Sequence, residues 1–276
     1  MNITDFKNKI YEQYYSHGRT FPWRDAPNPY HVFISEVMLQ QTQTSRVVPK
    51  FEQFIVAFPS FEALAAAPFP EVLLYWKGLG YNRRALSLQK SAQKIVTEFG
   101  GALPTCTKIL ESFPGIGPAT AASIVAFAFN KPTVFIETNI RTVFIYEFFR
   151  GQALVKDSEI LPLVEKTLDI QEPRMWYYAL TDYGVMLKKE LGSNNARSAH
   201  YVKQSKFIGS VRQIRGQILE FLLHTAQAQS CTIAKALQKD AVQIEALCML
   251  LCKEGLVEQI GMFFSIAKQY HKDVAS

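Results

Sequence analysis

Apolar residues recur at spacings of three and four along almost the whole stretch from residue 5 to residue 187. That period places them on one face of an α-helix, and nothing in the stretch alternates with the two-residue period of a strand. Prolines and glycines interrupt the pattern at short intervals, so the stretch divides into short helices. We therefore predict an all-α fold, with helices over roughly 5–16, 30–42, 45–57, 61–66, 70–76, 83–98, 107–112, 119–129, 139–149, 158–169 and 174–187.

The C-terminal part begins after a polar and basic stretch, residues 191–210, that is typical of a connector. Helical spacing then returns over 211–225, 230–238 and 241–254. Residues 254–268, EGLVEQIGMFFSIAK, alternate like a short hairpin. Three helices closed by a hairpin predict a small winged-helix-like domain.

The composition is that of a globular protein with a sizeable core: 276 residues, 48% of them hydrophobic and 20% charged. A net charge of +6 and a pI near 9.0 favour a polyanionic partner such as nucleic acid without demanding one. No stretch reaches the roughly 18 apolar residues of a membrane span, and the charged N-terminus lacks the apolar core of a signal peptide. We expect a cytoplasmic protein, associated with the nucleoid if bacterial, with no membrane partner. Four scattered cysteines are predicted to be reduced: Cys106, Cys231, Cys248 and Cys252.

Two glycines and two prolines stand directly ahead of an apolar helix in ESFPGIGPATAASIVAF, residues 111–127. In the FPGIG turn, Phe113 anchors the corner in the core, while Gly115 and Gly117 permit left-handed backbone angles and the close approach of another chain. The helix that follows starts with free backbone N–H groups, and its dipole favours negative charge there. An αα-hairpin without a ligand would show the same turn. The short amphipathic helix ahead of it and the basic composition favour a helix-hairpin-helix clamp for a DNA phosphate.

A single acidic residue, Glu36, lies in the otherwise apolar stretch PYHVFISEVMLQQTQ. Its helical neighbours Val32, Phe33 and Leu39 are hydrophobic, so its carboxyl group is expected in a poorly solvated place. Desolvation raises the pKa of a carboxyl group and makes it a proton donor near neutral pH. A buried glutamate satisfied by backbone groups or by an arginine is the alternative interpretation.

Two further stretches offer polar and aromatic groups to a nucleic acid. Gln40 and Gln41 open a polar cluster that can hydrogen-bond base edges, although glutamines also occupy ordinary helix surfaces. In YWKGLGYNRRAL a glycine corner displays Tyr81 beside two arginines, Arg83 and Arg84. An aromatic wedge with phosphate contacts has this layout, and so does a helix-terminating loop with a packed tyrosine.

A second carboxylate follows the clamp and its helix in VFIETNIRTVF. The hydrophobic run ends at Glu137, Thr138 and Asn139, which suit a helix start. Glu137 is therefore either a favourable charge at a helix N-terminus or a second acidic group for chemistry.

Together these four stretches resemble the helix-hairpin-helix DNA glycosylases, and within them the adenine glycosylases of the MutY type. The likeness runs from about Pro22 to Asp182 and includes, in one order, FPWR, SEVMLQQTQ, WKGLGYNRRAL, FPGIGPATA and the acidic residue of ETN. It implies two helical lobes with double-stranded DNA across the cleft, and a mispaired or damaged base flipped into a pocket between them. We expect a monomer. The implied parts are an N-terminal helix packing on the second lobe (1–20), a six-helix lobe with the helix-hairpin-helix (21–132), a second helical lobe (133–205) and the winged-helix-like domain (211–276).

Carried over by position, the resemblance gives Glu36 the role of the acid that protonates the departing purine and can also handle the attacking water. Glu137 matches the aspartate that stabilises the positive charge developing on the deoxyribose. The implied contacts to DNA or substrate are Tyr81 as the wedge, Gln40 and Gln41 beside the vacated position, Arg83 and Arg84 on phosphates, Arg24 and Asn139 near the pocket, Gly115 and Gly117 in the clamp, and Ala119 lining the pocket.

Two departures from the family pattern concern the chemistry. Related bifunctional lyases carry a catalytic lysine in the pattern GVGxKTA, whereas this chain reads GIGPATA with Ala119 at that position. Without a Schiff-base nucleophile we predict a monofunctional enzyme that leaves the abasic site uncut. The family's aspartate is Glu137 here, one methylene longer, and a displacement of about 1 Å can cost about a hundredfold in rate.

Two more departures concern cofactor and domain content. Typical members bind an iron–sulfur cluster through four cysteines after the segment equivalent to ALTDYGVML, but here KKELGSNNARSAHYVKQSKF follows, with no cysteine. We predict no cluster and no metal ligands, although a monovalent or divalent cation on the hairpin backbone is compatible with the resemblance. The segment after Ser210 is too short and too helical for the family's reader of 8-oxoguanine. With Arg212 and Arg215 on its first helix, it either adds a DNA contact or only packs against the core.

The leading hypothesis is a DNA glycosylase of base excision repair that hydrolyses the N-glycosidic bond of adenine mispaired with 8-oxoguanine or guanine. One alternative is a related glycosylase for another base, either mismatched thymine or uracil or a deaminated or alkylated base. The other is a non-catalytic DNA-binding paralogue. The presence of Glu36 argues against a mere binder, which gains nothing from a desolvated acid.

Overall fold

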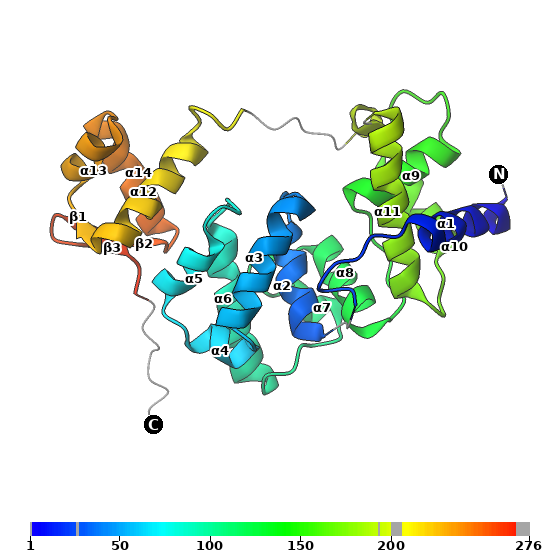
Figure 1. Ribbon diagram of the computed structural model, residues 1–276, viewed down its shortest axis with the longest axis horizontal. Helices are drawn as coiled ribbons and strands as arrows, with labels where there is room; N and C mark the ends of the chain where they lie inside the picture. Colours follow the sequence, from blue (N-terminus) through cyan, green and yellow to red (C-terminus); the bar gives the residue numbers. More distant parts are fainter. Residues whose placement is uncertain (1, 26–27, 193, 200–205, 269–276) are drawn as a thin grey trace. The chain divides into compact units, whose positions relative to one another are not determined.

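The computed structural model describes residues 2–25, 28–192, 194–199 and 206–268 (Figure 1). Its helices lie close to the ranges that the apolar period predicts, which confirms the all-α fold class. The largest differences are at two helix ends. Helix α11 continues to Leu191 instead of ending at residue 187. Helix α2 ends at Leu39, because the chain turns at Gln41 with a φ of 56° instead of remaining helical to residue 42. Up to residue 199 the helices are α1 (Ile3–His17), α2 (Pro29–Leu39), α3 (Thr44–Ala57), α4 (Phe61–Ala66), α5 (Phe69–Trp76), α6 (Arg83–Phe99), α7 (Thr107–Glu111), α8 (Pro118–Phe129), α9 (Thr138–Phe148), α10 (Asp157–Thr167), α11 (Pro173–Leu191) and the 3-10 helix η1 (Asn194–Arg197).

The chain separates into two compact units. The first is drawn from Met1–Glu36, Pro104–Ser112 and Ile116–Lys203, and the second from Val37–Leu103, Phe113–Gly115 and Gln204–Ser276. The predicted division at residues 1–20, 21–132, 133–205 and 211–276 stays a prediction, and its residues 200–205 and 269–276 lie outside the described part of the chain. None of the described helices combines the length and the apolar character that crossing a membrane requires.

In the first unit α11 is the central helix, and α1, α8 and α9 all pack against it (Figure 1). Phe6 of α1 meets Trp176 of α11 edge to face, with ring centroids 5.8 Å apart. It also packs on Phe144 of α9 at 5.5 Å. All three side chains are fully buried. Burial of each aromatic ring stabilises the fold by about 2 kcal/mol, so α1, α9 and α11 share one core.

Asp182 of α11 is the centre of a buried charged cluster. Its carboxylate accepts a hydrogen bond from the backbone N–H of Arg19 at 2.7 Å, and others from the guanidinium groups of Arg19 and Arg24 at 2.7 to 3.0 Å. The Arg24 side chain is only 9% exposed, so its charge depends on Asp182 for compensation. The cluster fastens the segment after α1 to α11.

Replacing Asp182 by asparagine keeps the shape of the side chain but leaves Arg24 buried without its counter-charge. We expect Asp182→Asn to lower the free energy of unfolding by about 3 kcal/mol or more, measured by urea titration. The exposed Asp5→Asn serves as the control and is expected to change it by less than about 0.5 kcal/mol. A loss below about 1 kcal/mol in Asp182→Asn contradicts this account of the cluster.

In the second unit α4 and α5 pack against α6. Arg84, in the first turn of α6, fixes the end of α2. Its Nη1 donates to the carbonyl oxygens of Val37, Met38 and Gln40 at 2.6 to 2.9 Å. Carbonyl groups at the end of a helix lack partners within that helix. The guanidinium group therefore acts as a C-cap and positions the chain that leaves α2.

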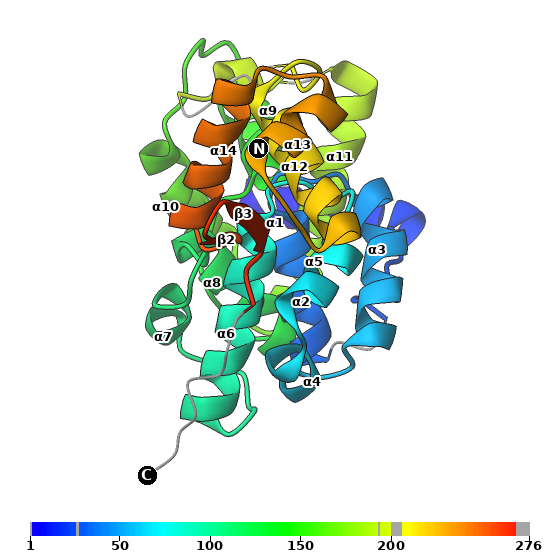
Figure 2. The same cartoon turned by 90° about the vertical axis from the view of Figure 1, so that its left-hand side faces the viewer.

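The C-terminal part of the second unit has the predicted winged-helix-like form (Figure 2). Three helices precede a hairpin of the strands β2 and β3, and the short strand β1, between the first two helices, completes an antiparallel sheet in the order β1-β3-β2. The first strand was not predicted, because two residues are too short to show a period. The elements are α12 (Val211–Thr225), β1 (Gln227–Ala228), α13 (Ser230–Leu237), α14 (Ala241–Lys253), β2 (Val257–Ile260) and β3 (Phe263–Ile266).

The two arginines of α12 both make contacts within the protein. Arg212 Nη1 donates a hydrogen bond to the hydroxyl group of Tyr81 at 2.7 Å. Arg215 forms a bidentate ion pair with Glu254, with Nη1 2.9 Å from Oε1. Of the two interpretations of α12, these contacts favour packing over a free basic surface.

Candidate active site

Glu36 lies in the last turns of α2, within the first unit, among side chains that exclude water. Val32 and Phe33 on the same helix are fully buried. The hydroxyl group of Ser123, on α8, donates a hydrogen bond to Glu36 Oε2 at 2.5 Å. Ser123 itself is only 5% exposed, whereas Glu36 keeps part of its surface accessible. The carboxyl group is therefore enclosed by protein and still within reach of a ligand.

Burial raises the pKa of Glu36 from the ordinary 4.5 to about 7. Smaller influences act in both directions. The hydrogen bond from Ser123 and the positive charge of Arg24 lower the pKa, and the negative charge of Glu137 raises it. A carboxylic acid with a pKa near 7 is protonated in a substantial fraction of molecules at neutral pH, so it can act as a general acid there.

Glu137 is the N-cap residue of α9. Its Oε1 accepts hydrogen bonds from the backbone N–H groups of Asn139 and Ile140 at 2.7 and 2.8 Å. The side-chain amide of Asn139 donates to Oε2 at 3.1 Å. Burial raises the pKa of Glu137, while the two backbone N–H groups and nearby positive charges lower it. The glutamate side chain folds back over the helix start, and N–H groups hold both of its oxygens in one orientation.

Arg24 and Tyr178 both interact electrostatically with Glu36: the charge of Arg24 lowers the pKa of Glu36, and the charge of Glu36 raises the pKa of Tyr178. The guanidinium group of Arg24 lies over the ring of Tyr178, 4.2 Å from its centroid. Tyr178 is 6% exposed, and its hydroxyl group has no hydrogen-bond partner among the described residues. A buried polar group without a partner costs about 1–3 kcal/mol. This hydroxyl group is therefore suited to a hydrogen bond with a ligand.

The predicted phosphate clamp is the turn between α7 and α8. Phe113 anchors it as expected and is 2% exposed. Gly115 has a φ of 76°, and a Cβ atom there would lie 3.1 Å from Ser87 Cβ, so the position requires glycine. Gly117 differs from the expectation, because it is the N-cap of α8 with an extended backbone at φ −90° and open space around it. Ala119 is exposed in the first turn of α8.

The glutamines after α2 lie in the second unit, on a turn and not on a helix. Gln40 Nε2 donates to the carbonyl oxygen of Gly115 at 3.1 Å, which ties this turn to the clamp. Gln41 is exposed and adopts a φ of 56°. Their predicted contact with base edges stays a prediction.

Tyr81 is 39% exposed and lies in the left-handed region at φ 48°, where an aromatic residue is rare. Backbone strain of this kind costs about 1–3 kcal/mol and is common at functional sites. Arg83 beside it is exposed. Because Arg84 is engaged by the end of α2, the geometry favours Arg83 over Arg84 for a phosphate, and both contacts stay predictions.

Within the described ranges no three histidine, cysteine, aspartate or glutamate side chains converge as a metal site. A [4Fe–4S] cluster needs four convergent thiolates. The sequence has no cysteine between Cys106 and Cys231, so the segment after α11 has no such ligands. The residues present therefore do not fit a cluster. A cation on the backbone of the hairpin stays a prediction.

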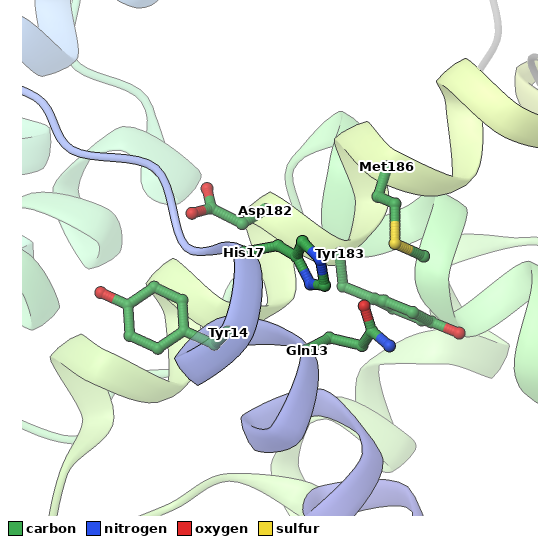
Figure 3. A pocket seen from close by; sticks show the side chains of 6 residues that line it. All are labelled: Gln13, Tyr14, His17, Asp182, Tyr183 and Met186. Atoms are coloured by element: carbon green, nitrogen blue, oxygen red, sulfur yellow. The ribbon is translucent and has the colours of Figure 1, made fainter.

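Figure 3 shows a crevice elsewhere in the first unit, between α1 and α11. None of the predicted site residues lines it. Its single carboxylate, Asp182, is already paired with two arginines, so we assign the crevice no catalytic role. Its lining residues are Gln13, Tyr14, His17, Asp182, Tyr183 and Met186.

Ser123 and Tyr178 are site residues that the sequence did not predict. Ser123 stands in the otherwise apolar stretch AASIVAF, and a lone polar residue on a buried helix is the signal that points to it. No such signal exists for Tyr178, because the sequence does not distinguish it from the adjacent Tyr177. The hydroxyl group of Tyr177 donates to the carbonyl oxygen of Thr133 at 2.6 Å, so the neighbour is structural.

Residues 34–159 match the HhH-GPD superfamily of base excision DNA repair proteins. An adenine DNA glycosylase from Mycolicibacterium smegmatis is 30% identical over 266 residues, which cover 89% of this chain and 90% of that protein. The chain belongs to the HhH-GPD superfamily. The matched region includes Glu36 and the two residues that act on its carboxyl group, Ser123 and Glu137.

The chain is also similar to a longer adenine DNA glycosylase and to a solved structure. It is 34% identical over 192 residues to an adenine DNA glycosylase from Buchnera aphidicola subsp. Baizongia pistaciae, covering 68% of this chain. It spans about half, 54%, of that relative's length. A thermostable thymine-DNA glycosylase shares the fold, with a TM-score of 0.62, 24% identity and coverage of 70% of this chain and 90% of that structure.

The raised pKa of Glu36 makes stability depend on pH in a defined direction. A carboxyl group whose pKa rises from 4.5 to about 7 on folding contributes stability that is fully present below 4.5 and is lost as the pH rises through 7. Glutamine at position 36 keeps the hydrogen bond from Ser123 and cannot ionise. We therefore expect Glu36→Gln to be more stable than the wild type at pH 8 by about 2 kcal/mol, relative to their difference at pH 5. Urea unfolding at both pH values measures this, with the exposed Glu52→Gln as control; equal differences at the two pH values would contradict it.

Proposed function

We propose that the chain is a monofunctional DNA glycosylase of base excision repair, which hydrolyses the N-glycosidic bond of adenine mispaired with 8-oxoguanine or guanine. The observation that carries the proposal is the pair Glu36 and Glu137. Burial keeps one carboxyl group protonated in a substantial fraction of molecules near neutral pH, and the other is held at a helix N-terminus close enough to raise the pKa of the first. Glycosidic bond hydrolysis uses two carboxyl groups with this division of roles. The names of the relatives from Mycolicibacterium smegmatis and Buchnera aphidicola support adenine as the base.

In the proposed reaction Glu36 gives its proton to the purine as the bond between the base and C1′ breaks. The bonding electrons leave with the base, which departs neutral, and positive charge remains on the deoxyribose. The carboxylate of Glu137, fixed by the N–H groups of Asn139 and Ile140, stabilises this charge. A water molecule then adds to C1′, and its proton returns to Glu36. Neither step requires a metal ion or a covalent intermediate with a lysine.

Groups around Glu36 can orient the base. The hydroxyl group of Tyr178 is buried beside Arg24 and lacks a partner among the described residues, so it can hydrogen-bond a flipped base next to the acid. Ser123 holds one carboxyl oxygen of Glu36 at 2.5 Å. That bond leaves the other oxygen to face the leaving group.

The contacts proposed for DNA lie on the clamp and on the turn before α6. The start of α8, from Gly117 to Ala119, is exposed and presents the N–H end of a helix, which suits a phosphate. Tyr81 is exposed in a strained conformation next to the exposed Arg83, which suits a side chain that enters the stack while its neighbour contacts the backbone. Ala119 occupies the place of the lyase lysine in related enzymes, so we propose that the product is an uncut abasic site.

The proposal predicts which duplexes the protein processes. Duplexes with a single A:8-oxoG, A:G, T:G, U:G or hypoxanthine:T pair are incubated with the protein and then treated with alkali, which breaks strands at abasic sites. We expect strand breaks from A:8-oxoG and A:G only, and only after alkali. Glu36→Gln is expected to reduce the single-turnover rate at least about a hundredfold, because it removes the general acid.

Other outcomes select other functions. Product from T:G, U:G or hypoxanthine:T alone indicates a glycosylase for another base. Tight binding without strand breaks after alkali indicates a non-catalytic DNA-binding protein. Strand breaks before alkali contradict the proposal that the enzyme lacks lyase activity because Ala119 stands in place of the lyase lysine.

Ser123 offers a test of the acid itself. Its hydrogen bond lowers the pKa of Glu36, so Ser123→Ala is expected to raise that pKa further. Activity that needs protonated Glu36 falls as the pH rises through its pKa, and the basic limb of the pH–rate profile should therefore move to higher pH. Ser91→Ala, a buried serine on α6, is the matched control and should leave the limb in place. A basic limb that does not move in Ser123→Ala argues against Glu36 as the titrating acid.

A further inference from the structure

Helices α9 and α11 approach each other very closely at one point. A Cβ atom on Gly184 of α11 would lie 2.4 Å from the backbone oxygen of Asn139 and 2.8 Å from its Cβ atom. Only glycine leaves room for this approach, so the start of α9 lies directly against α11. The residue that caps this start is Glu137, the second carboxylate of the candidate site.

Lys188 stands four residues after Gly184 and therefore on the same face of α11, one turn further along. Its Nζ donates a hydrogen bond to Asn139 Oδ1 at 2.7 Å. An ammonium group is a donor only, so it fixes which end of the Asn139 amide faces it. The other end, Nδ2, then faces Glu137 and donates to Oε2 at 3.1 Å.

This relay determines how Glu137 is held. The carboxylate has three N–H donors: the backbone N–H groups of Asn139 and Ile140 on Oε1, and Asn139 Nδ2 on Oε2. The first two follow from the helix start alone. The third depends on the orientation of the amide, because a flipped amide would place its oxygen against a carboxylate oxygen.

Three charged groups of the unit interact with Glu137. Lys188 on α11 and Arg141 on α9 act on it as positive charges, and its own negative charge raises the pKa of Glu36 on α2. Arg141 is engaged by Asp157 of α10 in a bidentate pair, with both N–O distances 2.7 Å, which reduces its effect on other groups. Lys188 instead directs its charge toward the carboxylate through a single neutral amide.

We propose that Lys188 is the positioning residue of Glu137: through the Asn139 amide it fixes the orientation of this carboxylate and keeps it ionised while the sugar becomes positively charged. The expected effect of Lys188 on the reaction rate rests on the proposed glycosylase reaction. Its expected effect on the ionisation of Glu137 does not. Burial lowers the pKa of Lys188 itself and the charge of Glu137 raises it, so the two groups stabilise each other's charged forms. Lys188 touches neither base nor sugar in this scheme, and it acts only through Asn139.

The kinetic test compares pH–rate profiles for adenine release from an A:8-oxoG duplex under single-turnover conditions with saturating enzyme. Lys188→Met removes both the charge and the donor, so the acidic limb, which reports ionisation of Glu137, should move to higher pH. The rate on the acidic side should fall about ten- to hundredfold. The basic limb, which reports Glu36, should stay in place. Lys188→Gln keeps a donor without the charge and should move the acidic limb while losing less rate at the optimum.

Lys189→Met is the matched control, because it makes the same change at the next, exposed position of α11. It should leave both limbs unmoved. An acidic limb that stays in place in Lys188→Met, or that moves equally in Lys189→Met, overturns the assignment while leaving the proposed function intact. Combining Lys188→Met with Asn139→Ala should cost little more than Asn139→Ala alone, whereas additive losses also overturn it.

A second readout does not depend on turnover. The side-chain carboxyl carbons of ¹³C-labelled glutamate are followed by NMR across pH, and the Glu137 signal is assigned by its loss in Glu137→Gln. Its titration midpoint should be higher in Lys188→Met than in the wild type and unchanged in Lys189→Met. An unchanged midpoint in Lys188→Met overturns the inference. If the wild type releases no adenine, the proposed function fails, and this titration still decides whether Lys188 acts on Glu137.

Discussion

The carboxyl group of Glu36 meets the hydroxyl group of Ser123 across α2 and α8, and its separation from water is the constraint on which the other site residues depend. Removing a carboxyl group from water favours its neutral form, so every nearby charge has to be placed with respect to it. Arg24 is paired with Asp182 and thus offers only part of its charge to Glu36. Glu137 stays close enough to raise the pKa of Glu36 because N–H groups at the start of α9 stabilise its own charge. The two carboxyl groups thus lie in two different surroundings, and the different role proposed for each follows from this difference.

Much of this arrangement is readable in the sequence because its causes are local. The three- and four-residue period of apolar positions predicted the helices, and Gly115 predicted the left-handed corner that the structure contains. Apolar neighbours within one turn predicted the desolvation of Glu36. The run that ends at Glu137 predicted a helix start, and the cap is formed by that same side chain.

What the sequence did not predict depends on contacts between residues far apart in the chain. Ser123 is 87 positions from Glu36, and Lys188 is 49 positions from Asn139, so no period or spacing links them. The sequence predicted Arg84 as a cation for a phosphate beside Tyr81, whereas in the structure it caps the end of α2, more than forty positions earlier. Propensity and pattern report which face of a helix is buried, but the partner of a polar group on that face is decided only when the helices pack.

The contact between Arg212 and Tyr81 gives the winged-helix-like part a thermodynamic connection to the turn before α6. The same helix, α12, also places Glu220 2.5 Å from Lys77, so the contact is part of a docked surface and not an isolated pair. Some ligands would bind Tyr81 more tightly when its hydrogen bond with Arg212 is broken. By linkage, such a ligand weakens the docking of α12 by the same free energy. Conversely, any contact that stabilises the docking of α12 lowers the affinity of Tyr81 for such a ligand. The C-terminal part thereby sets a threshold that a ligand of this aromatic side chain has to exceed.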